Sequence, residues 1–197
     1  MPYELDPLSD NCYLNTFVLI NKLDIREADK LAEYETLITF INSSRLELEP
    51  LEGNFDFEHY KAVHKFLFDE LYHWAGQTRT VNISKKGTRF CPFDEIESRA
   101  KLIFERLRRR NLFCGLSKFE FVAEILDFYC ITNELHPFRE GNGRAQRSFI
   151  IQLIRNAGYD INFSDIDVDL LMIATIKSAN GMNDLLNNIF EEAICMV

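Results

Sequence analysis

The segment from His136 to Arg147, with the sequence HPFREGNGRAQR, constrains the fold of this chain more than any other segment. Apolar residues recur at helical spacing before it, in residues 119–129, and after it, in residues 149–154. Pro137 ends the first of these helices, because proline donates no backbone hydrogen bond. The two glycines permit a sharp turn before a second helix that begins near Gly143. The pattern predicts two long helices joined by a compact loop.

The rest of the chain is predicted to be mainly α-helical. Asp56 is a suitable N-cap, Ser117 and Glu120 form a capping box, and Ser164 is the expected N-cap of a sixth helix. The predicted helices cover about 27–42, 56–74, 94–110, 117–135, 143–158, a segment from 164, and 182–193. We expect a single domain over residues 1–197, with its core in about 12–160 and C-terminal helices in about 164–193.

One segment has the alternation of a β-hairpin instead. Residues 78–83 form the first predicted strand, residues 84–87 the turn, and residues 88–90 the returning strand. An isolated two-stranded hairpin is only marginally stable in water. We therefore expect this hairpin to lie against the helices.

The composition limits the functions that the chain can have. Its formal net charge of −9 makes a nucleic-acid backbone an unsuitable partner. The five cysteines lack CxxC spacing, so neither a zinc site nor a disulfide framework is predicted. No N-terminal secretory signal is visible, and no uncharged apolar run approaches the roughly 18 residues that span a membrane. We expect a cytoplasmic protein, with translocation as an effector left open.

The loop between the two helices combines the groups that phosphoryl transfer requires. Its glycines and the start of the next helix present backbone N–H groups that favour an anion. Arg144 and Arg147 are three residues apart and suit phosphate oxygens, and Asn142 adds a neutral donor. Glu140 offers a carboxylate for Mg²⁺ shared with substrate phosphates. His136, a side chain with an ordinary pKa of about 6.5, is suited to take a proton from a hydroxyl group.

The same residues resemble the Fic motif, HPFx[DE]GNGRxxR, at every specified position. Residues 11–13 and 18–22 are similar to the family's N-terminal segment, and residues 74–79 are similar to its lead into a hairpin called the flap. The chain resembles the short, single-domain bacterial members of the family. The resemblance implies a helical bundle whose flap, at about 78–91, covers an active-site loop at 136–147.

The resemblance implies a protein adenylyltransferase, which moves AMP from ATP to a Ser, Thr or Tyr hydroxyl of a target protein and releases pyrophosphate. It makes His136 the general base and Glu140 the ligand of Mg²⁺. Arg144 is expected at the β-phosphate and Arg147 at the γ-phosphate. The implied nucleotide-binding residues are Gly141, Asn142, Gly143, Arg144, Arg147 and, near the adenine, Asn180.

The resemblance also implies a docking site for the target protein. A target segment is expected to add a β-strand to the flap. The implied docking residues are Ile83, Ser84, Lys85, Lys86 and Gly87. Phe138 is interpreted as a buried anchor of the loop. The histidines without a motif around them are predicted to have surface or interhelical roles; they are His59, His64 and His73.

Three other functions stay open. A related transferase would move UMP, phosphate or phosphocholine, but Gly143 favours AMP because phosphotransferase members of the family depart from GNG. A degenerate domain would bind nucleotide without catalysis, which the intact His136, Glu140 and Asn142 oppose. Removal of AMP from proteins would require an inhibitory glutamate, and the chain lacks a convincing one.

An inhibitory glutamate would also control the activity of the chain. Many Fic proteins carry an inhibitory helix, [ST]xxxE[GN], whose glutamate pairs with the second motif arginine, here Arg147. The nearest candidate is Glu35. Leu31 stands four residues before it, where the pattern requires Ser or Thr, and Thr36 follows it, where the pattern requires Gly or Asn. Glu35 is therefore interpreted as an ordinary residue of the first long helix. We therefore expect a small antitoxin-like partner that supplies the glutamate in trans, with self-modification or oligomerisation as alternatives.

Overall fold

The fold is mainly α-helical, as predicted. The computed structural model describes residues 4–5, 11–85 and 87–197. Its helices are α1 (Ala28–Leu48), α2 (Phe57–Phe68), α3 (Ile96–Arg109), α4 (Lys118–Leu135), α5 (Asn142–Asn156), α6 (Val168–Ser178) and α7 (Asp184–Ala193). Its strands are β1 (Glu4–Leu5), β2 (Ile83–Lys85), β3 (Thr88–Arg89), β4 (Tyr159–Asp160) and β5 (Cys195–Met196).

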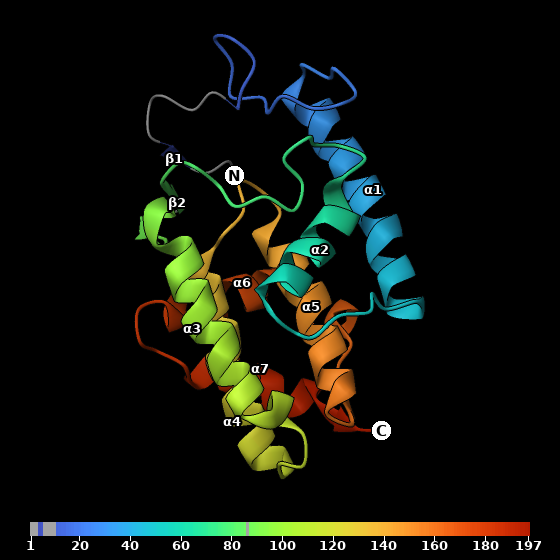
Figure 1. The fold of residues 1–197 in the computed structure, drawn as a ribbon, viewed down its shortest axis with the longest axis vertical. Helices are drawn as coiled ribbons and strands as arrows, with labels where there is room; N and C mark the ends of the chain where they lie inside the picture. The colour runs from blue at the N-terminus through green and yellow to red at the C-terminus, as the bar shows by residue number, and fades with distance from the viewer. Residues whose placement is uncertain (1–3, 6–10, 86) are drawn as a thin grey trace.

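Helix α5 lies in the middle of the bundle (Figure 1). It packs against α1, α2 and α4, and α4 also packs against α3 and α7. Buried aromatic rings fill the space between these helices: Phe149 of α5 lies 5.2 Å from Tyr60 and 5.8 Å from Phe104, measured between ring centroids. Because α5 is enclosed on several sides, the loop at its N-terminus starts from a rigid support.

Most helix starts agree with their predicted caps. The Asp56 side chain accepts a hydrogen bond from the His59 N–H at 2.8 Å, and the capping box of Ser117 and Glu120 is present. The predicted cap at Ser164 is wrong: Ser164 lies in a 3₁₀ turn (Phe163–Asp165). Asp167 is the N-cap of α6, and its carboxylate accepts the N–H of Leu170 at 2.7 Å.

Two helix ends differ from their predicted positions. Helix α1 continues to Leu48 instead of ending near residue 42, because Leu46 is buried in the core and no proline interrupts the helix before Pro50. Helix α2 ends at Phe68 instead of near residue 74. The buried residues Leu71 and Tyr72 lie after the helix has ended, so the apolar spacing of the sequence continues beyond the helix itself.

The flap is a three-stranded sheet with the order β1-β2-β3. Both pairings are antiparallel: Leu5 lies opposite Ile83 in the first, and Lys85 opposite Thr88 in the second. The predicted strand at 78–83 is mostly wrong, since strand pairing begins only at Ile83. Strand β1 and the β4–β5 pair were not predicted.

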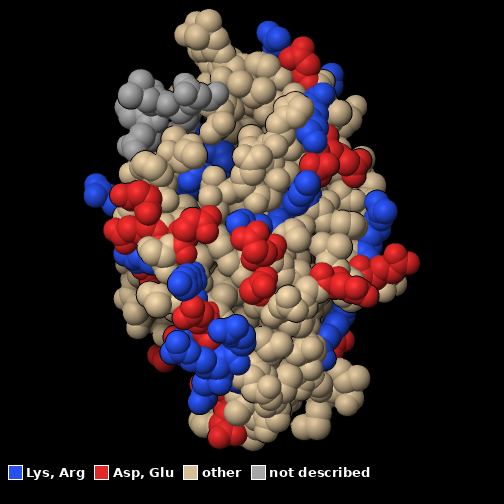
Figure 2. Space-filling model, viewed as in Figure 1, with Lys and Arg blue, Asp and Glu red and all other residues tan. Residues whose placement is uncertain are grey.

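Charged side chains of both signs are interspersed on the face shown in Figure 2. Between α3 and α4, Arg106 forms ion pairs with Glu124 and Asp127. Exposed pairs of this kind contribute about 0–1 kcal/mol each, so packing is the main source of stability. Among the described residues, no helix is both long and apolar enough to cross a membrane.

Candidate active site

The loop between α4 and α5 contains two residues with left-handed backbone conformations. His136, the C-cap of α4, has φ 42°, and Gly141, the N-cap of α5, has φ 76°. A non-glycine residue in this region is strained and is held there by its surroundings. A Cβ atom at Gly141 would lie 2.1 Å from Cζ of Phe68, so only glycine fits this position.

Asn142 closes this loop through its side chain. Its Oδ1 accepts the N–H of Phe138 and its Nδ2 donates to the Phe138 carbonyl, both at 2.8 Å. One amide hydrogen of Asn142 therefore serves the loop itself, and one remains for a ligand. Phe138 is fully buried, which confirms its predicted burial.

The imidazole ring of His136 is held by a backbone carbonyl and by a stacked aromatic ring. Its Nδ1 lies 2.9 Å from the carbonyl oxygen of Asn133. Because a carbonyl can only accept, Nδ1 carries the hydrogen and Nε2 is the unprotonated nitrogen. Phe90 stacks on the imidazole with ring centroids 3.7 Å apart. Burial lowers the pKa of His136 to about 3, and the nearby charges of Arg79 and Lys85 act in the same direction.

A cavity of about 300 Å³ opens beside His136. Its walls come from the loop, the flap and α6, and include His136, Gly143, Arg147, Lys85, Phe90 and Met172. A second cavity of about 420 Å³ shares Tyr129, Asn133 and Ala179 with the first. Their volumes are in the range of small-molecule sites. Asn180 follows Ala179 and is exposed, and its Nδ2 donates to the Ile176 carbonyl at 2.8 Å.

The first turn of α5 lies at one end of this cavity and has the features of an anion-binding site. Helical hydrogen bonding starts with the N–H groups of Arg144 and Ala145, which donate to the Gly141 carbonyl at 3.1 and 3.0 Å. The preceding N–H groups of Asn142 and Gly143 lie at the positive end of the helix dipole. A Cβ atom at Gly143 would lie 3.3 Å from Nη1 of Arg147, which places that guanidinium over the turn. Burial lowers the pKa of Arg147, because desolvation disfavours the charged guanidinium.

Glu140 is suited to bind Mg²⁺. Its Oε1 accepts the N–H of Gly141 at 2.9 Å, which leaves Oε2 for a metal ion. Burial and the charge of Glu35 raise the pKa of Glu140. The described residues contain no group of three His, Cys, Asp or Glu side chains that could hold a metal ion. A single carboxylate fits Mg²⁺, which takes its other ligands from water and substrate phosphates.

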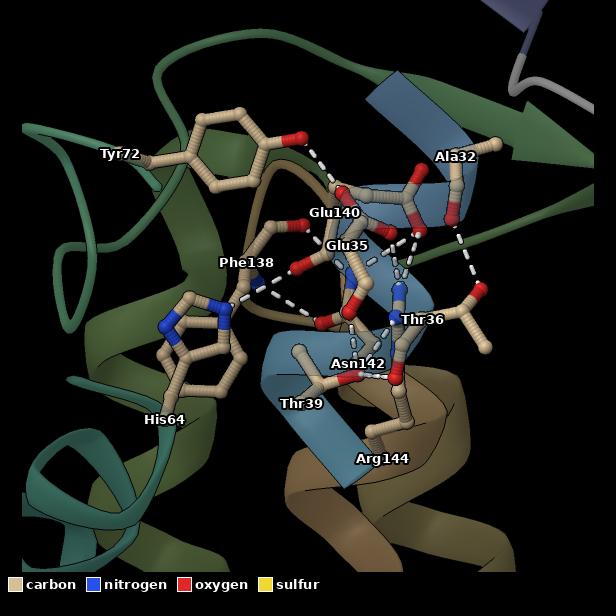
Figure 3. Close-up of polar contacts among 11 residues, drawn as sticks. Ala32, Glu35, Thr36, Thr39, His64, Tyr72, Phe138, Glu140, Asn142 and Arg144 are labelled. Atoms are coloured by element: carbon tan, nitrogen blue, oxygen red, sulfur yellow. Dashed lines mark hydrogen bonds and ion pairs between the residues drawn. The ribbon is translucent and has the colours of Figure 1, made fainter. Parts of the chain in front are cut away.

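Arg144 contacts α1 (Figure 3). Its Nη2 forms an ion pair with Glu35, its Nη1 donates to Oγ1 of Thr39 at 3.1 Å, and its Cζ lies 4.9 Å from the centroid of the Phe68 ring. The interpretation of Glu35 as an ordinary helix residue is therefore wrong. The structure brings His136, Gly143 and Arg147 together in one cavity and places Arg144 between this loop and α1.

His64 is a site residue that the motif did not reveal. It is fully buried, its Nε2 lies 3.0 Å from the Glu140 carbonyl, and its Nδ1 accepts the N–H of Gly76 at 2.9 Å. Its ring stacks on Phe138 with centroids 3.8 Å apart. Burial lowers its pKa to about 3. The neutral imidazole thus connects the backbone of Glu140 to the segment that leads into the flap.

Arg79 is the second unpredicted site residue. Its Nε donates to the carbonyl of His136 at 2.9 Å, its Nη2 donates to the carbonyl of Cys91, and its N–H donates to the carbonyl of Pro137 at 2.8 Å. These bonds connect both ends of the flap to the catalytic loop.

The predicted docking residues lie in the central strand of the flap and in its turn. Ile83, Ser84 and Lys85 form β2, which pairs with β1 on one side and β3 on the other. Gly87 lies in the turn, and Lys86 lies outside the described residues. A target strand at the outer edge of β2 would have to replace β1.

Comparison with known proteins is consistent with this geometry. Residues 54–154 match the model of the Fic/DOC family. VbhT of Bartonella schoenbuchensis, named a protein adenylyltransferase, is 38% identical over 92% of this chain, although the chain spans only 37% of its length. Fic of Salmonella typhimurium, named a probable protein adenylyltransferase, is 36% identical over 90% of this chain and 88% of its own length. The crystal structure of BepC from Bartonella tribocorum, with bound AMPPNP, has a TM-score of 0.89, is 28% identical, and covers 95% of this chain and 97% of that chain.

Proposed function

Because the chain belongs to the Fic/DOC family, we propose that it transfers AMP from ATP to a hydroxyl group of another protein. The observation that carries the proposal is the neutral His136, whose Nε2 lone pair is unprotonated beside a cavity that also contains Arg147. The names of its relatives and the AMPPNP bound to BepC support the choice of reaction and nucleotide.

The transfer step follows from this arrangement. The hydroxyl oxygen of the target forms a bond to the α-phosphorus, the bond from that phosphorus to the bridging oxygen breaks, and pyrophosphate leaves. Nε2 of His136 accepts the hydroxyl proton. The N–H groups at the start of α5, with Arg144 and Arg147, bind phosphate oxygens. Mg²⁺ at Glu140 would neutralise charge that gathers on the leaving pyrophosphate.

The second substrate and the regulation are part of the proposal. We propose that a target segment docks at the flap as an added strand, with its hydroxyl directed toward His136. A small partner that supplies a glutamate to Arg147 in trans would restrain the enzyme. We propose action in the cytoplasm, with translocation as the alternative, since BepC is described as a VirB-translocated effector.

Labelled ATP tests the reaction directly. The purified protein, Mg²⁺ and a cell lysate are incubated with ATP labelled at the α- or the γ-phosphate. We expect protein labelling from the α-phosphate only, and a loss of about 10²–10⁴-fold in His136→Ala with nucleotide binding retained. Labelling from the γ-phosphate alone would contradict AMP transfer, and labelling from neither would favour a binding module.

A further inference from the structure

The guanidinium of Arg144 contacts α1 (Figure 3), and Phe68 of α2 packs against it. Glu35 forms the ion pair with Nη2, Thr39 accepts from Nη1 at 3.1 Å, and the ring of Phe68 lies under Cζ. Only 26% of the Arg144 side chain is exposed. A guanidinium has five N–H donors, so these contacts leave three of them for a bidentate bond to a phosphate.

Glu35 is itself fixed by buried groups. Its second carboxylate oxygen accepts the hydroxyl of Tyr72, which is fully buried and stacks on Trp74 with ring centroids 4.3 Å apart. Burial raises the pKa of Tyr72, so the hydroxyl stays protonated and donates. Thr39 donates to the backbone carbonyl of Glu35 at 2.6 Å. Moving the carboxylate would leave the buried Tyr72 hydroxyl and Arg144 without this partner, which is costly.

The position of Glu35 also differs from that of an inhibitory glutamate. Such a residue would have to pair with Arg147 and compete with the γ-phosphate. Arg147 lines the cavity beside His136, whereas α1 contributes no described residue to its walls. Glu35 contacts the other motif arginine, Arg144, and is only 13% exposed.

We propose that Glu35, supported by Tyr72 and Thr39, positions Arg144 for a nucleotide phosphate and so strengthens nucleotide binding. Holding the long side chain in one conformation before the ligand arrives lowers the entropy cost of binding. The proposal rests on the proposed function for the identity of the ligand. In this role Glu35 strengthens nucleotide binding, which is the opposite of the effect of an inhibitory glutamate.

The affinity for AMPPNP with Mg²⁺, measured by titration calorimetry, tests this role. Glu35→Gln keeps the shape of the side chain and removes its charge, and we expect about tenfold weaker binding. Thr39→Val removes the hydroxyl at nearly constant volume and should weaken binding to a smaller extent. Glu33→Gln changes an exposed glutamate on the same helix and should leave the affinity unchanged.

A double-mutant cycle separates positioning from general structural damage. In an Arg144→Ala background, Glu35→Gln should have no further effect on affinity, because Glu35 acts through Arg144. A structural defect would instead weaken binding by the same factor in both backgrounds. Thermal unfolding of each variant identifies misfolding, and Thr39→Val carries the test if Glu35→Gln does not fold.

Three results would overturn the proposal. The first is an unchanged affinity for AMPPNP in Glu35→Gln, and the second is an equal loss of affinity in the Arg144→Ala background. The third is a gain in AMP transfer by Glu35→Gln, which would identify Glu35 as an inhibitory residue. The binding cycle needs no turnover. A wild-type protein that binds AMPPNP but transfers no label would therefore refute the proposed function and leave this inference standing. A wild-type protein that does not bind AMPPNP would refute both.

Discussion

AMP transfer by this chain should tolerate mildly acidic conditions, because His136 is already neutral in the folded protein. Its ring is buried under Phe90, and burial lowers its pKa to about 3. A depressed pKa means that the proton is lost at a lower pH than from an ordinary histidine. The base should therefore stay in its active, unprotonated form as the pH falls from 7.5 to 5.5.

The expected difference is large enough to measure. With an ordinary pKa of about 6.5, roughly one His136 side chain in 11 would be neutral at pH 5.5, and kcat/KM would fall about tenfold. With a pKa of about 3, more than about 99% of the side chains stay neutral at that pH, and the contribution of the base is unchanged.

The assay is the initial rate of transfer from α-labelled ATP between pH 5 and 8, at constant free Mg²⁺ and low substrate. Phe90→Leu removes the stacked ring, and water then reaches the imidazole and raises its pKa. We expect the acid limb of this variant to move toward pH 6.5. Phe93→Leu, a change at an exposed aromatic residue near the end of the flap, should keep the wild-type profile.

A wild-type acid limb with its midpoint near pH 6.5 would refute this reasoning. Protonation of Glu140, whose pKa is raised by burial, also lowers activity in acid. The two groups are distinguished by Mg²⁺: a higher concentration competes with protons at Glu140 and moves its limb to lower pH, whereas it does not affect the titration of His136 in the free enzyme.

Three further experiments test other parts of the site. His64→Phe keeps the ring stacking but removes the hydrogen bond to the Glu140 carbonyl. We therefore expect AMP transfer to require more Mg²⁺ and to slow about tenfold. His73→Phe, at an exposed position, should change neither the Mg²⁺ requirement nor the rate. Leu5→Pro disrupts the pairing of β1 with β2 and should raise kcat/KM for a protein target without changing the KM for ATP; a lower value would contradict docking at that edge. His64 and His136 both have depressed pKa values, so their contribution to stability is present above pH 6.5 and lost as the pH falls toward 3. Urea denaturation should show a loss of roughly 1 kcal/mol per histidine between pH 7 and 5.5, and His64→Phe should lose less than the wild type.

The helices could be predicted from the sequence because their apolar residues recur at helical spacing over many residues. The capping box at Ser117 and the cap at Asp56 were likewise local signals. The end of α2 could not be predicted, because Leu71 and Tyr72 stay buried after the helix has ended and continue its spacing. Strand β1 has only two residues, so it has no periodicity, and its partner lies far along the chain.

The catalytic loop could be predicted because its residues are adjacent in sequence. His136, Gly143 and Arg147 indeed face one cavity. The motif could not show which groups orient these residues, since the partners come from distant segments. Arg79 binds the carbonyl of His136 from the segment before the flap, and Glu35 binds Arg144 from α1.

A weaker signal for two of these partners was present in the helical pattern. His64 lies four residues after Tyr60 and three before Leu67, on the face that buries both of them. Glu35 lies four residues after the buried Leu31 and four before the buried Thr39. A polar group on a buried helical face must find hydrogen-bonding or charged partners, because burial without them is costly. In a chain whose active-site loop contains three arginines and backbone carbonyls that accept side-chain hydrogen bonds, that requirement directs a buried carboxylate or imidazole toward the loop. Such residues position a motif through the contacts that they make from outside it, and mutation of each should alter the motif residue that it contacts.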